Sequence, residues 1–389
     1  MLGMKRVFVI QNTPLQEPLP LSVFLSGLLS HLVRSEEFEW NVVVGQSHAL
    51  PPALRERARR VHILPTRTYS ILDNIRFALR TWGILRREHR SARIDILHCF
   101  YPNSSLLGVV LFKMFSRCRA PVIYDVRSPW IDMSIARGFI KPGLARIYRA
   151  LLYFQERRLC RRAAAFVFVT RGLADVYREK VTIRSSQRVS VIPSGVDLDR
   201  FRPVESRFRR RLGVGRDEIL ICSVGGIAAV RRQDEFLPLF KEVCRCHPGV
   251  KLVFVGEGDL LARLKQRTTE MGLDGRVIFT GAVPHDQVPE IICACDFGLS
   301  HLPDMFVHRH NFSLKILEYL ACGVPALASR IDSNMVLARM LRGVFIYDGA
   351  EDILKVLERP RPIEVETDLS RFSWPKLAEA YRDIYRILE

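Results

Sequence analysis

The chain has 389 residues, which exceeds the size of one ordinary domain and favours two. Its apolar fraction of 48% is enough for hydrophobic cores, but no apolar run approaches the roughly 18 residues of a membrane-spanning helix. The nine cysteines lie mostly in expected strands and helices, which favours reduced, buried thiols in a cytosolic protein over a disulfide framework. The first residues are expected to form a buried strand and not a signal peptide.

The net charge of +18 is distributed unevenly along the chain. Residues 1–200 contain 32 Lys and Arg against 15 Asp and Glu, whereas the remainder contains 27 against 26. The first part therefore carries +17 and the second +1. A positive field confined to one half indicates that this half meets an anionic partner. An anionic small substrate, an anionic lipid surface and nucleic acid all fit this field.

In the first half, short apolar runs alternate with segments of helical periodicity. The expected strands are 5–11, 40–44, 61–64, 94–99, 121–125, 165–170 and 188–192. The expected helices are 22–33, 69–90, 105–115, 141–165 and 171–180. Strands that are apolar throughout and alternate with helices are typical of a parallel sheet covered on both faces.

After Pro193-Ser194-Gly195 a second alternation begins. Its expected strands are 219–224, 252–255, 277–280, 297–299 and an apolar run that ends at 329. Its expected helices are 235–247, 260–271, 288–294, a helix around 314–321 and an amphipathic helix at 374–388. The sequence therefore predicts an α/β protein with two doubly wound, Rossmann-like domains, at 1–203 and 204–370, and a terminal segment at 371–389. Ligands of such domains bind outside the carboxyl ends of the strands, here expected to face a cleft between the domains.

The stretch His310–Ser329 predicts a turn, a helix and a strand. Asn311 and Ser313 are common N-cap residues, and the helix that follows offers its N–H groups and positive dipole end to a phosphate. Lys315 adds a positive charge in the first turn. Glu318 lies close to the same face, where a carboxylate can accept hydrogen bonds from ribose hydroxyls. The pattern suggests a nucleotide, although a Glu near a helix start is often only solvated.

Glycines follow two of the expected strands in the second half, as Gly225-Gly226 and as Gly256-Glu257-Gly258. Glycine allows the backbone to approach a ligand closely, and it also allows a tight turn. Either explanation fits these positions.

The sequence resembles the retaining glycosyltransferases of family 4, which have the GT-B fold. Four stretches carry the resemblance in the expected order. They are Val191–Asp197 (VIPSGVD) with Phe201 and Pro203, Leu252–Gly258 (LVFVGEG), Val277–Val283 (VIFTGAV) followed by Cys295-Asp296, and Lys315–Pro325 (KILEYLACGVP). The resemblance is dense in the second domain and thin in the first. It implies that the terminal helix crosses back to the N-terminal domain and that a nucleotide-diphospho-sugar binds the second domain.

The resemblance also implies roles for particular residues. Glu318 would hold the ribose, Arg231 and Lys315 with the start of its helix would hold the diphosphate, and the backbone near Val283 would meet the base. The implied donor-binding residues are Gly225, Gly226, Arg231, Gly256, Val283, His310, Ser313, Leu314, Lys315 and Glu318. Arg231 and Lys315 would also act in catalysis by stabilising charge on the leaving diphosphate. That phosphate can take the acceptor proton, so neither a protein base nor a metal or other cofactor is expected.

Four positions depart from the family pattern. His310 stands where the first of two Glu residues is usual, and Gly226 stands where an Arg is usual. Arg127 replaces a His after the strand at 121–125, and the segment 18–20 (PLP) replaces a Gly-Gly loop. In the first domain, His98 and Arg127 at strand ends are then the candidates for substrate contact and catalysis. A strand-end imidazole such as His98 can equally serve only the structure.

The basic helices expected at 69–90 and 141–162 mix Arg with Leu, Trp, Ile and Tyr, a composition that suits an anionic bilayer surface. A solvated Arg-rich face is the alternative. We therefore expect a glycosyltransferase that moves a sugar from a nucleotide-diphospho-sugar to a lipid-linked or polysaccharide acceptor, in the cytoplasm or bound peripherally to the inner face of the cell membrane. A catalytically impaired partner subunit and a nucleotide-sugar epimerase on the same fold are the alternatives. No motif supports a nucleic-acid partner.

Overall fold

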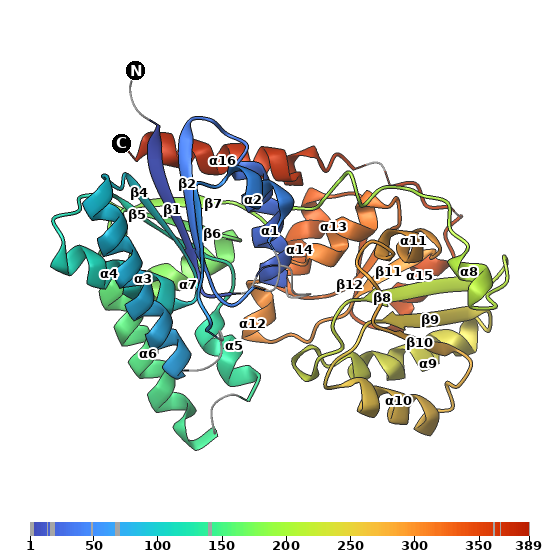
Figure 1. The fold of residues 1–389 in the computed structure, drawn as a ribbon. Helices are drawn as coiled ribbons and strands as arrows, with labels where there is room; N and C mark the ends of the chain where they lie inside the picture. Colours follow the sequence, from blue (N-terminus) through green and yellow to red (C-terminus); the bar gives the residue numbers. More distant parts are fainter. Residues whose placement is uncertain are drawn as a thin grey trace. The chain divides into compact units, whose positions relative to one another are not determined.

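The computed structural model describes residues 4–13, 15, 20–47, 50–66, 71–138, 142–360, 362–365 and 367–388. The chain forms two compact units (Figure 1). Unit 1 comprises Met1–Gly195 together with Trp374–Glu389, and unit 2 comprises Val196–Ser373. The boundaries predicted at 203 and 370 thus fall inside unit 2. Of the sequence features above, residues 18, 19, 69, 70 and 141 lie outside the described part.

Unit 1 contains a parallel sheet of seven strands in the order β3-β2-β1-β4-β5-β6-β7. The strands are β1 (Lys5–Gln11), β2 (Phe38–Val44), β3 (Arg60–Ile63), β4 (Ile96–Phe100), β5 (Val122–Val126), β6 (Ala165–Phe168) and β7 (Arg188–Val191). The order reverses between β1 and β4, as in doubly wound sheets. All seven strands were predicted from their apolar runs. The central ones are buried along their whole length because helices cover both faces.

The helices of unit 1 lie on the two faces of this sheet (Figure 1). They are α1 (Pro20–Leu32), α2 (Pro52–Arg57), α3 (Ile71–Ser91), α4 (Asn103–Phe115), α5 (Trp130–Ala136), α6 (Ala145–Cys160), α7 (Arg171–Val181) and α16 (Trp374–Ile387). The sequence missed α2 and α5, which are too short to show a helical repeat. It also made α6 too long. A 3₁₀ turn at Pro142–Leu144 precedes α6, and bonds from Arg162 N–H to Leu159 and from Ala163 N–H to Cys160 end it in a tight turn.

The terminal helix α16 packs on α1 within unit 1, as the sequence predicted. It buries Trp374, Tyr381 and Tyr385, and the Trp374 ring meets the Phe24 ring edge-on at 5.6 Å between centroids. The helices approach so closely that a Cβ on Gly27 would lie 2.3 Å from Trp374. Each such aromatic side chain contributes about 1.5–3 kcal/mol of burial, so α16 is part of the core of unit 1.

Unit 2 contains a parallel sheet of six strands in the order β10-β9-β8-β11-β12-β13. The strands are β8 (Ile219–Val224), β9 (Val250–Val255), β10 (Val277–Gly281), β11 (Phe297–Ser300), β12 (Ala326–Ser329) and β13 (Val344–Tyr347). The α-helices are α8 (Phe208–Arg211), α9 (Phe236–Cys246), α10 (Leu261–Glu270), α11 (Val288–Cys293), α12 (Phe306–Arg309), α13 (Leu314–Ala321), α14 (Asp332–Met340) and α15 (Ala350–Leu357). The order reverses between β8 and β11, and α13 lies against β11 and β12.

The sheet of unit 2 has an apolar core on each face. Along β8, Leu220 and Cys222 face a core shared with α13, whereas Ile219 and Ile221 face a core shared with α9. This alternation is what a doubly wound sheet requires. The fold class predicted from the sequence, two Rossmann-like α/β units, is therefore confirmed.

Candidate functional site

Helix α13 is fixed firmly over the point where the strand order of unit 2 reverses. The Tyr319 hydroxyl accepts a hydrogen bond from Val224 N–H at the end of β8 (3.1 Å) and donates one to the Leu299 carbonyl in β11 (3.2 Å). A Cβ on Gly298 would lie 2.2 Å from the Tyr319 ring, so β11 needs a glycine there. These contacts hold α13 in register with the carboxyl ends of both strands, where open α/β sheets bind ligands.

The two ends of α13 differ in how they are capped. Ser313 occupies the N-cap position, but its Oγ lies 3.0 Å from Ser300 Oγ and does not cap the helix. At the other end Gly323 has φ +74°, and the N–H groups of Gly323 and Val324 bond the carbonyls of Leu320 and Tyr319. This is a Schellman motif, so the predicted glycine stop is confirmed. The side-chain cap predicted at the start is not made.

Lys315 and Glu318 lie on α13 as half-buried ionisable groups. Among the described residues, neither the Lys315 ammonium nor the Glu318 carboxylate has a hydrogen-bond or ion-pair partner. Burial, together with the nearby charge of Arg231, lowers the pKa of Lys315 to about 7. Burial raises the pKa of Glu318 to about 7, against the opposing charges of Lys315 and Arg200. Half-buried charges without partners are costly, and they occur mainly where a ligand is meant to complete them.

The loop after β8 brings Arg231 into the electrostatic range of Lys315. Arg231 lies in a 3₁₀ turn (Ala229–Arg231), and its Nη1 donates to the Gly226 carbonyl at 3.2 Å. The Gln233 amide donates to the same carbonyl at 3.0 Å, and His308 Nε2 lies 2.9 Å from the Val230 carbonyl. The structure therefore gathers three predicted residues, Arg231, Lys315 and Glu318, around one region of unit 2.

The glycines at the strand ends allow loops to pack against each other. Gly256 has φ +141°, and a Cβ there would lie 2.2 Å from the Gly225 carbonyl oxygen. A Cβ on Gly258 would lie 2.0 Å from the Ile227 carbonyl oxygen. These glycines are thus needed because the loops after β8 and β9 pack closely against each other, which the sequence analysis did not predict. Gly226 is different, because a Cβ there would meet only the Glu257 carbonyl oxygen, at 4.0 Å.

The remaining donor residues of the sequence prediction lie on neighbouring loops of unit 2. Val283 follows β10 and is partly buried against the core that α13 shares. His310 follows α12, and its ring meets Phe306 edge-on at 5.0 Å between centroids. Leu314 is the first residue of α13.

His301 is a candidate that the sequence analysis missed. It comes directly after β11, its Nδ1 lies 2.7 Å from the Tyr347 hydroxyl, and its ring stacks on Tyr347. Its Nε2 is buried and has no hydrogen-bond partner among the described residues. Burial and the charge of Lys315 lower the pKa of His301 to about 4, so the ring is neutral near pH 7. Its position at a strand end on the switch point is the signal that could have identified it.

In unit 1, the two predicted catalytic residues are engaged in holding α16. His98 is fully buried, and its Nδ1 lies 2.7 Å from the Tyr385 hydroxyl. Arg127 donates to the Ile192 carbonyl (2.8 Å) and Ser194 Oγ (3.2 Å) and lies over the Phe24 ring. Asp125, also fully buried, faces both residues and accepts a hydrogen bond from Tyr381. In the structure both His98 and Arg127 contact α16, and their predicted contact with substrate stays a prediction.

Within the described residues, no group of three or more His, Cys, Asp or Glu side chains is arranged to hold a metal ion. No described helix combines the length and the apolar character needed to span a bilayer.

Two Rossmann-like units, the second with helix α13 at its switch point, have the architecture of the GT-B fold. Residues 204–368 match the family described as glycosyl transferases group 1, and residues 22–200 match glycosyltransferase family 4. The chain is 30% identical, over 79% of its length and 69% of the relative, to D-inositol 3-phosphate glycosyltransferase of Segniliparus rotundus. The chain thus belongs to glycosyltransferase family 4, a family of EC class 2.4 enzymes.

Two further similarities cover nearly the whole chain. An Escherichia coli relative, UDP-Gal:alpha-D-GlcNAc-diphosphoundecaprenol alpha-1,3-galactosyltransferase, is 23% identical over 92% of this chain and 88% of its own. The solved structure of sucrose-phosphate synthase from Thermosynechococcus elongatus superposes with a TM-score of 0.74 at 15% identity and covers 99% of both chains. At this identity the structural likeness establishes the fold alone.

Proposed function

We propose that the protein is a retaining glycosyltransferase that transfers a sugar from a nucleotide-diphospho-sugar to a lipid-linked or polysaccharide acceptor. The observation that carries the proposal is the half-buried, unpartnered pair Lys315 and Glu318 on α13, with Arg231 nearby. A nucleotide supplies what both groups lack. Its diphosphate matches the cations, and its ribose hydroxyls match the carboxylate.

In this proposal Glu318 accepts hydrogen bonds from the ribose, and Lys315 and Arg231 hold the diphosphate. The start of α13, at Ser313 and Leu314, adds its positive dipole end. The loop glycines, including Gly225 and Gly256, position these groups by packing against each other. Val283 and His310 flank the region as contacts for the base and the sugar.

The chemical step needs stabilisation of the charge that develops on the leaving diphosphate as the glycosidic bond breaks. Arg231 and Lys315 are fixed before the reaction by the β8 loop and by α13, which is the condition for effective electrostatic stabilisation. The leaving phosphate then takes the proton of the acceptor hydroxyl, and the acceptor oxygen bonds to the anomeric carbon on the face from which the diphosphate departs, so the configuration at that carbon is retained. With this charge provided by side chains, neither a metal ion nor another cofactor takes part.

His301 is a further candidate in the donor site. Its neutral ring is oriented by the Tyr347 hydroxyl, and its unpartnered Nε2 can donate or accept one hydrogen bond. A sugar hydroxyl or a phosphate oxygen would satisfy this atom. We assign to it the positioning of the donor and no role in proton transfer.

We infer the class of acceptor from the name of one relative and from the charged and apolar surface of unit 1. The Escherichia coli relative is named for a UDP-sugar donor and a diphospho-lipid acceptor. Residues 1–200 carry +17, and large apolar side chains are exposed on α3 and α6. Exposed apolar and basic side chains on the same helices suit the surface of an anionic membrane. We propose peripheral association of the protein, made in the cytoplasm, with that surface.

A second candidate function follows from His310 and Gly226, which replace a Glu and an Arg of the family pattern. An imidazole cannot accept hydrogen bonds from two sugar hydroxyls as a carboxylate does. In this alternative the chain binds a nucleotide but serves as a catalytically impaired partner subunit.

A hydrolysis screen separates these candidates. The purified protein is incubated with a panel of UDP-, GDP- and ADP-sugars, and slow release of nucleoside diphosphate is measured. The enzyme is expected to release it from at least one donor, and Lys315→Met is expected to abolish this release. Binding of a nucleoside diphosphate without any release would favour the impaired subunit. No binding to any of the three diphosphates would overturn both.

A further inference from the structure

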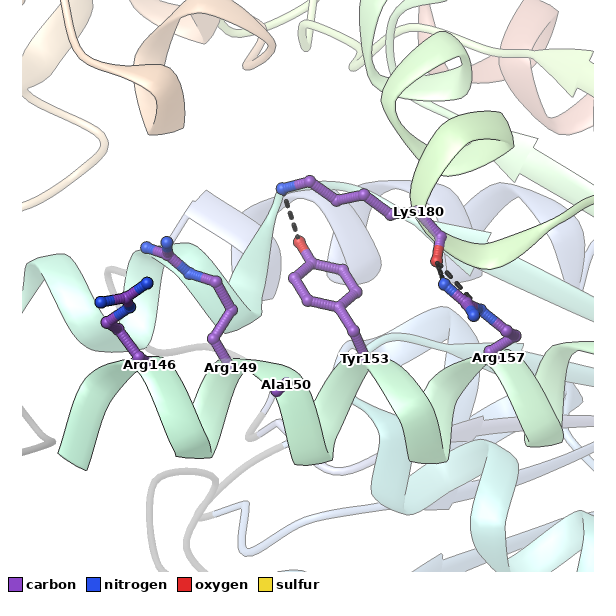
Figure 2. Close-up of a pocket in the computed structure, with 6 residues that line it drawn as sticks. All are labelled: Arg146, Arg149, Ala150, Tyr153, Arg157 and Lys180. Carbon is purple, nitrogen blue, oxygen red and sulfur yellow. Dashed lines mark hydrogen bonds between the residues drawn. The ribbon is translucent and has the colours of Figure 1, made fainter.

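A basic hollow of about 320 Å³ lies between α6 and α7 of unit 1 (Figure 2). Arg146, Arg149, Tyr153 and Arg157 line it from successive turns of α6, and Lys180 reaches over Tyr153 from the end of α7. All of these residues belong to unit 1. The hollow is therefore formed by residues of unit 1 alone.

Positive charge in the hollow exceeds negative charge. Asp132, on α5, accepts from Arg149 Nε at 3.0 Å and from Lys180 Nζ at 3.3 Å, so one carboxylate serves two cations. Arg157 donates to the Lys180 carbonyl at 3.0 Å. Arg146 is exposed and forms no ion pair with a described residue. Four cationic side chains against one carboxylate leave a net charge that a doubly charged anion would offset.

The floor of the hollow is held in a fixed arrangement by buried hydrogen bonds. The Tyr153 hydroxyl donates to Asp132 at 2.6 Å, which orients the carboxylate toward Lys180. One turn along α6, the fully buried Glu156 accepts from the hydroxyls of Tyr124 (3.0 Å) and Tyr177 (2.9 Å). Cations that are fixed before an anion arrives lose little side-chain entropy on binding it.

The neighbouring face of α6 exposes an apolar stripe. Each of the large apolar side chains in this stripe is 55–62% exposed. They are Leu144, Ile147, Leu151 and Phe154. At about 100° per residue, this stripe lies roughly a third of a turn around the helix from the basic hollow. Arg158 lies over the Phe154 ring, at 4.8 Å from its centroid. Helix α6 thus has one buried face, one basic face and one exposed apolar face.

We propose that this part of unit 1 binds the doubly charged phosphate monoester head group of a lipid within a bilayer. The phosphate occupies the hollow beside Arg146, Arg149, Arg157 and Lys180, while the apolar stripe enters the acyl region beside the head groups. The two faces are adjacent on one helix, as the two parts of a phospholipid are adjacent in a membrane. This inference deepens the proposed function, since it locates the membrane contact, and it rests on the proposed lipid acceptor class.

Vesicle binding tests the proposal directly. The full chain is sedimented with vesicles of phosphatidylcholine alone, with added phosphatidic acid, or with added oleate at the same surface charge. We expect binding to the phosphatidic acid vesicles and at least tenfold weaker binding to the other two. Equal binding to all three, equal binding with oleate, or no binding to any would overturn the phosphate site.

Two variants, each with a matched control in unit 2, locate the contact. Arg146→Glu is expected to weaken binding to phosphatidic acid vesicles by roughly tenfold, since each basic residue near an anionic surface contributes about 1 kcal/mol. Leu151→Gln is expected to weaken it by several-fold. The controls Arg245→Glu on α9 and Val336→Gln on α14 also change exposed residues and should bind as the unaltered protein does. Variants that bind like their controls would overturn the assignment to α6.

Soluble anions identify the source of the phosphate. If glycerol 3-phosphate or pyrophosphate displaces the protein from vesicles and Leu151→Gln has no effect, the hollow serves a free phosphate, and the lipid proposal is wrong. Nucleoside-diphosphate binding is measured in parallel by calorimetry. If the unaltered protein binds a nucleoside diphosphate but no vesicle, this site is refuted and the donor proposal stands.

Discussion

Each unit contains one group of ionisable residues that is shielded from water, in and after central strands of unit 1 and on helix α13 of unit 2. In unit 1, His98, Asp125 and Arg127 are closed off by α16 and bonded to its tyrosines. In unit 2, Lys315 and Glu318 remain half-buried without partners. The first group bonds the strands of unit 1 to α16. For the second group we propose that a nucleotide supplies the partner. Bonding to the rest of the protein is thus what separates the group that serves the fold from the candidate site.

The largest effect is expected when the unit 1 group loses its carboxylate. Asp125→Ala leaves Arg127 and Tyr381 buried without their partner, which should lower the free energy of unfolding by about 3–5 kcal/mol. All four tryptophans (Trp40, Trp82, Trp130 and Trp374) lie in unit 1, so tryptophan fluorescence during denaturation reports this unit.

Asp175→Ala is the matched control, because Asp175 pairs with Arg178 on the surface of the same unit. Such an exposed pair contributes about 0–1 kcal/mol. Equal destabilisation by both variants would contradict a structural role for the Asp125 group.

A second prediction concerns the loops that place the donor residues. Gly256→Ala should destabilise unit 2 by roughly 1–3 kcal/mol or more, because its Cβ would meet the Gly225 carbonyl at 2.2 Å and its φ is +141°. Gly226→Ala, in open space, should change stability by less than about 0.5 kcal/mol. Thermal unfolding followed by far-ultraviolet circular dichroism compares the two. A larger loss for Gly226→Ala would show that the loop packing described above is wrong.

A smaller effect is expected in the number of protons that the protein takes up when a nucleoside diphosphate binds. With a pKa of about 7, Lys315 is mostly neutral at pH 8, and a bound diphosphate favours its charged form and raises that pKa. Binding at pH 8 should therefore take up as much as about one proton, and binding at pH 6 much less. Calorimetry in buffers of different ionisation enthalpy measures this uptake. Lys315→Arg, which stays charged at both values, should bind without it; the same uptake in this variant would exclude Lys315 as its source.

Much of the fold follows from the sequence, because apolar runs that alternate with helical periodicity leave few arrangements other than two parallel sheets. The elements between Ser329 and the terminal helix were missed, since β13, α14 and α15 are short and lack strong punctuation. In the site, α13 was predicted with its correct stop. The half-buried environment of Glu318 could not be predicted from the sequence. It depends on the packing of Tyr319 against β8 and β11, which no local sequence pattern encodes.

The sequence does not reveal which strand-end residues are covered by an element from elsewhere in the chain. His98 and Arg127 look like cleft residues in the sequence, because both stand at the ends of apolar strands. Only the return of α16, some 250 residues later in the chain, covers them. His301 has the same local pattern and was overlooked, although its ring nitrogen is unpartnered in the structure.

The most direct test of the central claim is calorimetric titration of the unaltered protein and of Glu318→Ala with UDP, GDP and ADP. If Glu318 awaits a ribose, the variant should bind its preferred diphosphate more weakly by about 1–3 kcal/mol. Its unfolding transition should stay the same or rise, because a half-buried carboxyl without partners is removed. Unchanged affinity together with reduced stability would mean that Glu318 serves the fold as the Asp125 group does, and the distinction between the two groups would fail.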